Sequence, residues 1–201
     1  MKPQIHLINP ITDCPSYFNL DSMKAQSGKS GVLTMALALP TVAALIPQDL
    51  FSVTLCDEAI SAIDFDVEAR FIGLTTMVNQ WQRAKEICAE FRRRGKIVII
   101  GGPHASLCPD IVRPHCDILV RGELEDIAEN FFQDLARGNW QREYIGSRCD
   151  LTTSPAPRLE LYPNDRAFAG SIQTSRGCPF QCEFCCNPRC NSLPYSAGSG
   201  N

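Results

Sequence analysis

Short apolar, β-branched runs alternate with amphipathic stretches through the first 145 residues of this chain. Strands are predicted at 5–9, 51–56, 70–75, 97–100 and 116–120, and helices at 33–46, 80–94 and 124–136. Such an alternation places successive strands parallel to one another and packs the helices over the faces of the sheet. The sequence therefore predicts an α/β fold, a doubly wound, Rossmann- or flavodoxin-like sheet of five parallel strands.

Glycines mark the ends of several of these elements. The run Ile97 to Ile100 is apolar throughout, which is typical of a parallel strand buried on both faces, and Gly101, Gly102 and Pro103 end it. Gly95 and Gly138 are predicted to close the helices that precede them. Ligands of doubly wound sheets bind over the carboxyl ends of the strands, so the loops after the strands are the first place to look for a site.

Composition narrows the class of protein. The chain has 201 residues and a net charge of −3 with mixed signs, which gives no basic stripe for a nucleic-acid partner. No secretory signal is recognised at the start, and the longest apolar run, 32–46, is shorter than a membrane span. A cytoplasmic protein is expected, in which the eleven cysteines serve as metal ligands more often than as disulfides.

Three regions are expected along the chain. Residues 1–145 form the first domain, 146–170 a linker with Pro155, Pro157 and Pro163, and 171–201 the start of a second domain. A strand is predicted at 171–175, directly before a cluster of cysteines.

The cysteine cluster has a regular spacing. Cys178, Cys182 and Cys185 lie four and then three positions apart, and three thiolates on one loop can each bind one iron of a [4Fe–4S] cluster, leaving the fourth iron open. A zinc site that uses Cys186 or Cys190 is the alternative. The scattered cysteines are interpreted as small buried residues: Cys14, Cys56, Cys88, Cys108, Cys116 and Cys149.

This Cys-x3-Cys-x2-Cys motif, with Phe184 before its last cysteine, resembles the signature of radical S-adenosylmethionine (SAM) enzymes. The resemblance implies that Cys178, Cys182 and Cys185 hold the cluster, that SAM binds the open iron, and that Phe184 packs against the adenine side of SAM. It also implies cleavage of SAM to a 5′-deoxyadenosyl radical.

The first domain resembles the N-terminal domain of cobalamin (B12)-dependent radical SAM enzymes. The resemblance rests on Gly101-Gly102-Pro103-His104-Ala105, on Val120-Arg121-Gly122-Glu123 followed by Glu125, and on Asp57-Glu58, each after a predicted strand. It implies a small-molecule partner, cobalamin, over these loops. The cofactor-binding residues implied are Leu74, Thr75, Thr76, Gly101, Gly102, Pro103, His104, Gly122 and Glu123.

One motif of other cobalamin proteins is absent, the Asp-x-His-x-x-Gly sequence that supplies a lower axial histidine. A base-off cobalamin without a histidine ligand is therefore expected, and His104 can equally be a loop residue that hydrogen-bonds backbone. Nucleotide binding is the competing interpretation. It lacks the Gly-x-Gly-x-x-Gly turn, because Asn9-Pro10-Ile11-Thr12-Asp13 follows the first strand.

Sixteen polar, glycine-rich residues follow Cys185, too few to form a catalytic barrel. The sequence thus predicts a truncated cobalamin- and cluster-binding radical SAM protein, whose full-length relatives carry out methyl transfer or related radical chemistry on a substrate that these residues do not identify. A free-standing cobalamin-binding module and a zinc-stabilised α/β protein are the alternatives.

Overall fold

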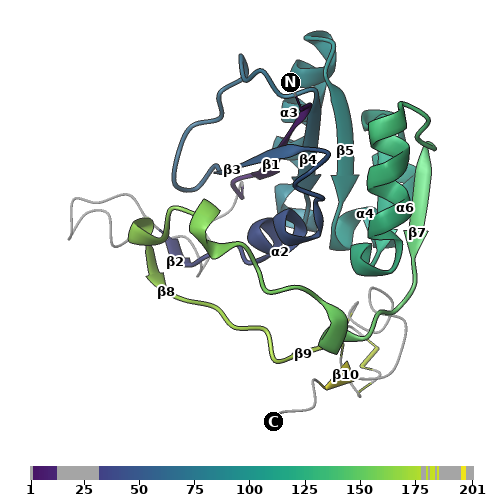
Figure 1. Ribbon diagram of the computed structural model, residues 1–201. Helices are drawn as coiled ribbons and strands as arrows, with labels where there is room; N and C mark the ends of the chain where they lie inside the picture. Colours follow the sequence, from purple (N-terminus) through teal and green to yellow (C-terminus); the bar gives the residue numbers. More distant parts are fainter. Residues whose placement is uncertain are drawn as a thin grey trace.

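A computed structural model of the protein describes residues 2–12, 32–177, 180, 182, 183, 185, 196 and 197. Its centre is a sheet of parallel strands with helices over both faces (Figure 1). The strand order is β3-β1-β4-β5-β6-β7, so the order reverses between β1 and β4. The predicted doubly wound architecture is confirmed, although the sheet has six strands and not five.

The predicted strands lie within two residues of the observed ones. The strands of the sheet are β1 (Gln4–Asn9), β3 (Ser52–Asp57), β4 (Phe71–Thr75), β5 (Ile97–Gly101), β6 (Ile118–Gly122) and β7 (Glu143–Gly146). β7 was not predicted, because Glu-Tyr-Ile-Gly is short and only half apolar. It pairs with β6 in the register Val120 opposite Tyr144 and extends the sheet past the expected domain end at 145.

Five α-helices are described: α2 (Ala38–Leu45), α3 (Trp81–Arg93), α4 (Pro103–Leu107), α5 (Pro109–Val112) and α6 (Leu124–Arg137). α3 and α6 match the predicted helices, and Gly95 and Gly138 follow them with φ of 74° and 73°. α4 and α5 each begin with proline, whose fixed φ suits the first position of a helix. Short 3-10 turns connect these elements: η1 (Val78–Gln80), η2 (Arg113–His115), η3 (Leu151–Thr153), η4 (Leu159–Leu161) and η5 (Asn164–Arg166).

Alternation along each strand builds two cores, one on each face of the sheet. On β5, Ile97 and Ile99 face the core that contains α2 and α6, whereas Val98 and Ile100 face the core that contains α3, α4 and α5. Burial of each large aliphatic side chain contributes about 1.5–3 kcal/mol. Most buried side chains of both faces are therefore apolar, and apart from His6 in β1 the buried polar side chains lie at or beyond the strand ends.

Two predictions near the first helix and the cysteine motif were wrong in part. Residues 33–46 are not one helix, because 32–34 form a strand, β2, that pairs in parallel with β8 (Ala167–Ala169). The strand predicted at 171–175 is reduced to β9 (Ser175–Arg176), which pairs with β10 (Ser196–Ala197). In both places tertiary pairing sets the strand limits, and local propensity does not.

The segment from 147 to 176, most of which was predicted to be a linker, runs past the carboxyl ends of the strands toward β8 and returns to β9 (Figure 1). Tyr162 anchors it in the core, and its hydroxyl donates to the buried carboxylate of Asp57 at 2.5 Å. The backbone N–H of Arg158 donates to the carbonyl of Pro40 at 3.0 Å. The segment is therefore packed against the first domain.

None of the helices in the described part of the chain is long and apolar enough to cross a membrane.

The carboxyl ends of β6 and β7 are in close backbone contact at two glycines, Gly122 and Gly146. A Cβ on Gly122 would lie 2.0 Å from the carbonyl oxygen of Gly146, and a Cβ on Gly146 would lie 1.8 Å from that of Glu123. No side chain fits in such a contact. The two glycines let the backbones approach closely enough to fix the start of α6.

We expect Gly122→Ala to destabilise the fold more than Gly138→Ala. Both residues have φ of +73°, so both variants carry the left-handed strain of about 1–2 kcal/mol. Among the described residues no atom lies within 4 Å of a Cβ on Gly138, whereas the methyl group at 122 collides with backbone, which adds roughly 1–3 kcal/mol. Urea unfolding measures both variants. Equal losses would show that the β6–β7 contact is looser than the structure indicates.

Candidate cofactor site

The loops that follow β4, β5 and β6 hydrogen-bond to one another at the carboxyl edge of the sheet. The N–H of Thr76 donates to the carbonyl of Gly101 at 3.1 Å, and the N–H of His104 donates to the carbonyl of Thr76 at 3.0 Å. The N–H of Gly122 donates to the hydroxyl of Ser106 at 3.0 Å. The structure therefore brings the loop residues singled out in the sequence together at one edge.

Gly102 is required by this arrangement. Its φ is +94°, and a Cβ there would lie 2.9 Å from both the hydroxyl oxygen of Thr75 and the backbone nitrogen of Thr76. Only glycine adopts this conformation without strain and without a collision. The loop after β5 consequently presents bare backbone at the edge.

A cleft of about 420 Å³ opens at the same edge, between the sheet and the helices α2 and α6. Most predicted cofactor-binding residues line it: Leu74, Thr75, Gly101, Gly102, Pro103, Gly122 and Glu123. Thr76 and His104 do not belong to its lining, and Phe184 lies outside the described residues. The remaining walls are mainly apolar side chains of β1, α2 and α6, among them Leu7, Val42 and Phe131.

Sequence reasoning missed the residues that give the cleft its depth. Gly73, in the middle of β4, has no side chain on the face toward α2, and a Cβ there would lie 2.7 Å from Cδ2 of Leu7. A glycine inside an apolar strand signals a close approach of this kind, and that signal was present in the sequence. Gln173 and Arg176, from the segment before the cysteine motif, also line the cleft and had no such signal.

Two carboxylates stand at the mouth of the cleft, at the start of α6. The guanidinium of Arg176 contacts both, with 2.9 Å from Nη2 to Oε1 of Glu125 and 3.5 Å from Nη1 to Oε2 of Glu123. The backbone N–H of Cys149 donates to Oε2 of Glu123 at 2.9 Å. These side chains lie near the positive end of the α6 dipole, which favours the negative charge.

The thiol of Cys149 belongs to the same group. Burial, together with its hydrogen bond to Glu123, raises the pKa of Cys149 to about 12, so the thiol is neutral at pH 7. Ligand atoms of Glu123, Glu125 and Cys149 lie within 4.8 Å of one another, which is close enough for a metal ion. Because Arg176 already pairs with both carboxylates, we assign no metal to this group.

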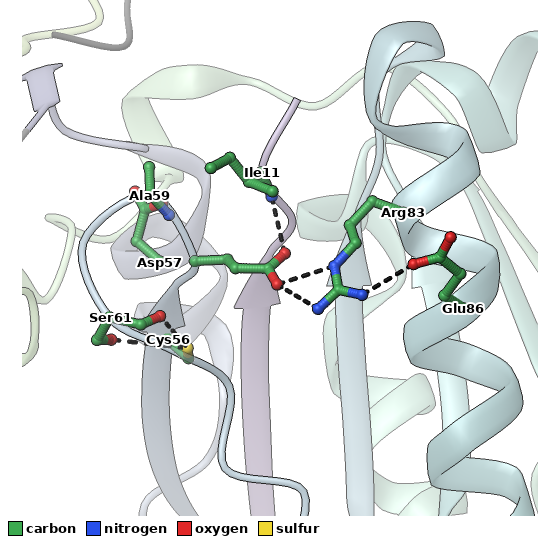
Figure 2. A network of polar contacts seen from close by, with 8 residues as sticks. Ile11, Cys56, Asp57, Ala59, Ser61, Arg83 and Glu86 are labelled. Atoms are coloured by element: carbon green, nitrogen blue, oxygen red, sulfur yellow. Dashed lines mark hydrogen bonds and ion pairs between the residues drawn. The ribbon is translucent and has the colours of Figure 1, made fainter. Parts of the chain in front are cut away.

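A second polar cluster holds the edge at β1 and β3. Asp57 accepts hydrogen bonds from Tyr162 and, at 3.2 Å, from the amide of Asn9. Glu58 accepts from the N–H of Ile11 at 3.0 Å and from Arg83 at 2.5 Å (Figure 2). The pair Asp57-Glu58, which contributed to the resemblance, thus serves to fasten the loop after β1 and the connecting segment.

His104 is buried behind the cleft. Its ring lies against Trp81, with 5.1 Å between ring centroids. Among the described residues Nε2 of His104 has no hydrogen-bond partner, and burial lowers the pKa of the ring. His104 is therefore a buried core side chain that is neutral at pH 7.

The cysteine motif is described only in part. Cys182 is exposed, Cys185 is half-buried, and the N–H of Cys185 donates to the carbonyl of Cys182 at 3.1 Å. Cys178, like Phe184, lies outside the described residues. Of the scattered cysteines, Cys56, Cys88 and Cys116 are buried as predicted, Cys108 and Cys149 are half-buried, and Cys14 is outside the described residues.

The sheet, with a ligand-sized cleft at its switch-point edge, defines a cofactor-binding α/β domain. Comparison with known protein families identifies the family to which this domain belongs. The B12 binding domain family matches residues 24–132, which are 109 of the 201 residues. The chain belongs to the B12-binding domain family.

Relatives of known name are longer than this chain. It is 34% identical over 177 residues to the hopanoid C-2 methylase of Rhodopseudomonas palustris, and the aligned region covers 85% of the chain and 32% of the relative. It is 33% identical over 180 residues to an uncharacterized methyltransferase of Synechocystis sp., with the same coverage of both. It is 29% identical over 168 residues to the bacteriochlorophyllide d C-8(2)-methyltransferase of Chlorobaculum tepidum, and the aligned region covers 79% of the chain and 37% of the relative. The chain spans about a third of the length of these relatives.

Acidification below pH 6.5 should weaken the fold through two buried histidines. Burial lowers the pKa of His6 and of His104 below the value of 6.5, so in this range the unfolded chain binds protons that the folded chain does not. The free energy of unfolding then falls with pH, by at most about 1.4 kcal/mol per pH unit for each ring. Urea unfolding between pH 7.5 and 5.5 measures the slope, and the double variant His6→Gln/His104→Gln should flatten it. An unchanged slope in that variant would contradict the assignment.

Proposed function

We propose that this chain binds cobalamin in the base-off form, with the nucleotide tail in the cleft and the corrin over the loops after β4, β5 and β6. The cleft is the observation that carries the proposal, because it opens among the same glycine loops that the sequence singled out. Membership of the B12-binding domain family supports it.

The residues present suit this group. The apolar walls from α2 and α6 fit a flat benzimidazole, and a volume of about 420 Å³ is too small for a whole cobalamin. The broad corrin then has to remain outside, over loops whose glycines allow a backbone to approach closely. The part of the β1 loop that is described, Asn9 to Thr12, contains no histidine, and His104 is held against Trp81. Neither place would supply a histidine to hold the cobalamin, which agrees with the base-off form proposed.

We further propose that Cys178, Cys182 and Cys185 bind a [4Fe–4S] cluster to which SAM binds, as in radical SAM enzymes. When bound, the cobalamin supplies a carrier for a methyl group and the cluster supplies the electron that cleaves SAM. The residues of this chain hold the two cofactors and keep them near each other.

The reaction we propose for the whole protein is methyl transfer. Its relatives include a hopanoid C-2 methylase and a bacteriochlorophyllide d methyltransferase, which supports this class of reaction. The chain covers about a third of each relative, so it represents the cofactor-binding part of such an enzyme.

Anaerobic reconstitution with iron, sulfide and hydroxocobalamin tests both halves of the proposal. After desalting, the wild-type chain should show a corrin band and a broad iron–sulfur absorption. A variant with Cys178→Ala, Cys182→Ala and Cys185→Ala should keep the corrin band and lose only the iron–sulfur absorption.

The other possible outcomes each support a different function. A corrin band with no cluster in the wild type indicates a free-standing cobalamin-binding module. Stoichiometric zinc in the wild-type chain, lost in the triple variant, indicates a zinc-stabilised protein. The lack of a corrin band would contradict cobalamin binding and bring back nucleotides as candidate ligands.

Filling the cleft should weaken cobalamin binding without unfolding the chain. Val42 lines the cleft from α2, and Val42→Trp places an indole in the space proposed for the nucleotide tail. We expect the Kd for hydroxocobalamin to rise at least about tenfold, which corresponds to about 1.4 kcal/mol.

The matched control is Ala44→Trp, two residues further along α2 and outside the cleft lining. Its Kd should stay within about threefold of the wild type. Fluorescence quenching titrations measure both variants, and circular dichroism checks that both are folded. If the two variants bind equally well, the tail does not enter this cleft.

A further inference from the structure

Arg176 joins the segment before the cysteine motif to the mouth of the cleft. Nη2 donates to Oε1 of Glu125 at 2.9 Å and to Oε1 of Gln173 at 3.1 Å, and Nη1 lies 3.5 Å from Oε2 of Glu123. Glu125 and Arg176 are 51 residues apart in the chain. The contact is thus a long-range link between the B12-binding domain and the segment that leads into the motif.

The link is shielded from water. The side chain of Arg176 is 17% exposed, and those of Glu123 and Glu125 are 9% exposed. Charge-assisted hydrogen bonds are stronger than neutral ones, and shielded ion pairs are screened less by salt than exposed ones.

The two carboxylates are held by rigid elements. Both belong to the start of α6, whose position is set by the contact of Gly122 with Gly146. The N–H of Cys149 fixes Oε2 of Glu123 from the other side. Arg176 is therefore attached to a fixed point of the sheet edge.

The first cysteine of the motif follows Arg176 by two residues. Two residues of chain span at most about 7 Å between Cα atoms. Arg176 and Gln173 also line the cleft. A cluster bound at Cys178 is consequently tethered within a short reach of the cleft mouth for as long as Arg176 holds the two carboxylates.

We propose that Arg176 is a positioning residue that sets the distance between the two cofactor sites, by fastening the cysteine loop to Glu123 and Glu125. This inference rests on the proposed function, since it takes cobalamin at the cleft and a cluster at the motif as given. It adds a physical coupling between them: when the link is broken, the two sites are no longer fixed relative to each other.

Pulsed electron paramagnetic resonance on the reconstituted full chain tests the proposal. Cob(II)alamin and the reduced cluster are both paramagnetic, so their dipolar coupling reports the distance between them. The wild type should give a narrow distance distribution. Arg176→Gln, which removes the charge, should broaden the distribution at least about twofold when samples fully loaded with corrin and iron are compared.

Two further variants separate positioning from general destabilisation. Exchanging the charges with Arg176→Glu/Glu125→Arg should restore a narrower distribution than Arg176→Gln gives. The control Arg166→Gln removes an exposed arginine of the same segment, paired with its neighbour Asp165, and should leave the distribution as in the wild type.

A second measurement needs no cofactor. In the cofactor-free chain, hydrogen exchange of residues 171–177 should be about tenfold faster in Arg176→Gln than in the wild type, because the link opens more often. Unchanged exchange, or equal distance distributions in fully loaded wild type and Arg176→Gln, overturns this proposal alone. A wild type that takes up no corrin or no cluster overturns the proposed function and, with it, this inference.

Discussion

Water is excluded from both faces of the central strands β1, β4, β5 and β6, and this burial decides where polar chemistry can occur in the chain. Inside the sheet the backbone N–H and C=O groups pair between strands, and the buried side chains on both sides are apolar except for His6. Charged and hydrogen-bonding side chains have to collect at the strand ends. At the carboxyl edge the loops satisfy one another, as the bonds of Thr76 with Gly101 and His104 show. The cleft opens in that polar edge and extends into the apolar interior, so a ligand with one polar and one apolar part suits it.

The sequence predicts the strands and the longer helices well, because their apolar periods are set by burial on one or two faces. β5 is buried on both faces and contains a run of four apolar residues. α6 is buried on one face only, and its sequence is amphipathic. β7 was not predicted, because a four-residue edge strand buries too few side chains to produce a recognisable apolar pattern in the sequence. The region 33–46 was extended into one helix because Val32 to Thr34 is apolar enough for either structure, and its pairing with β8 is not visible locally.

The sequence predicted the loops of the candidate site but not the cleft that extends from them into the core. Gly101, Gly102, Gly122 and Glu123 stand directly after strands, where parallel topology brings them to one edge. The cleft itself results from a mismatch across the core, where Gly73 faces α2, and no single segment encodes such a gap. The partner of Glu123 and Glu125 was equally hidden, since an arginine 51 residues away is one of many that could pair with a glutamate. Long-range ion pairs leave no periodic trace in a sequence.

The side chains of Tyr162 and Arg176 fasten the segment from 147 to 176 along the same edge, Tyr162 to Asp57 and Arg176 to the start of α6. Because Gln173 and Arg176 form part of the cleft wall, widening the mouth requires this segment to move, and its two fastenings oppose that movement. Exchange of a ligand between the cleft and solvent then depends on the opening of a fastening as well as on the ligand's own contacts.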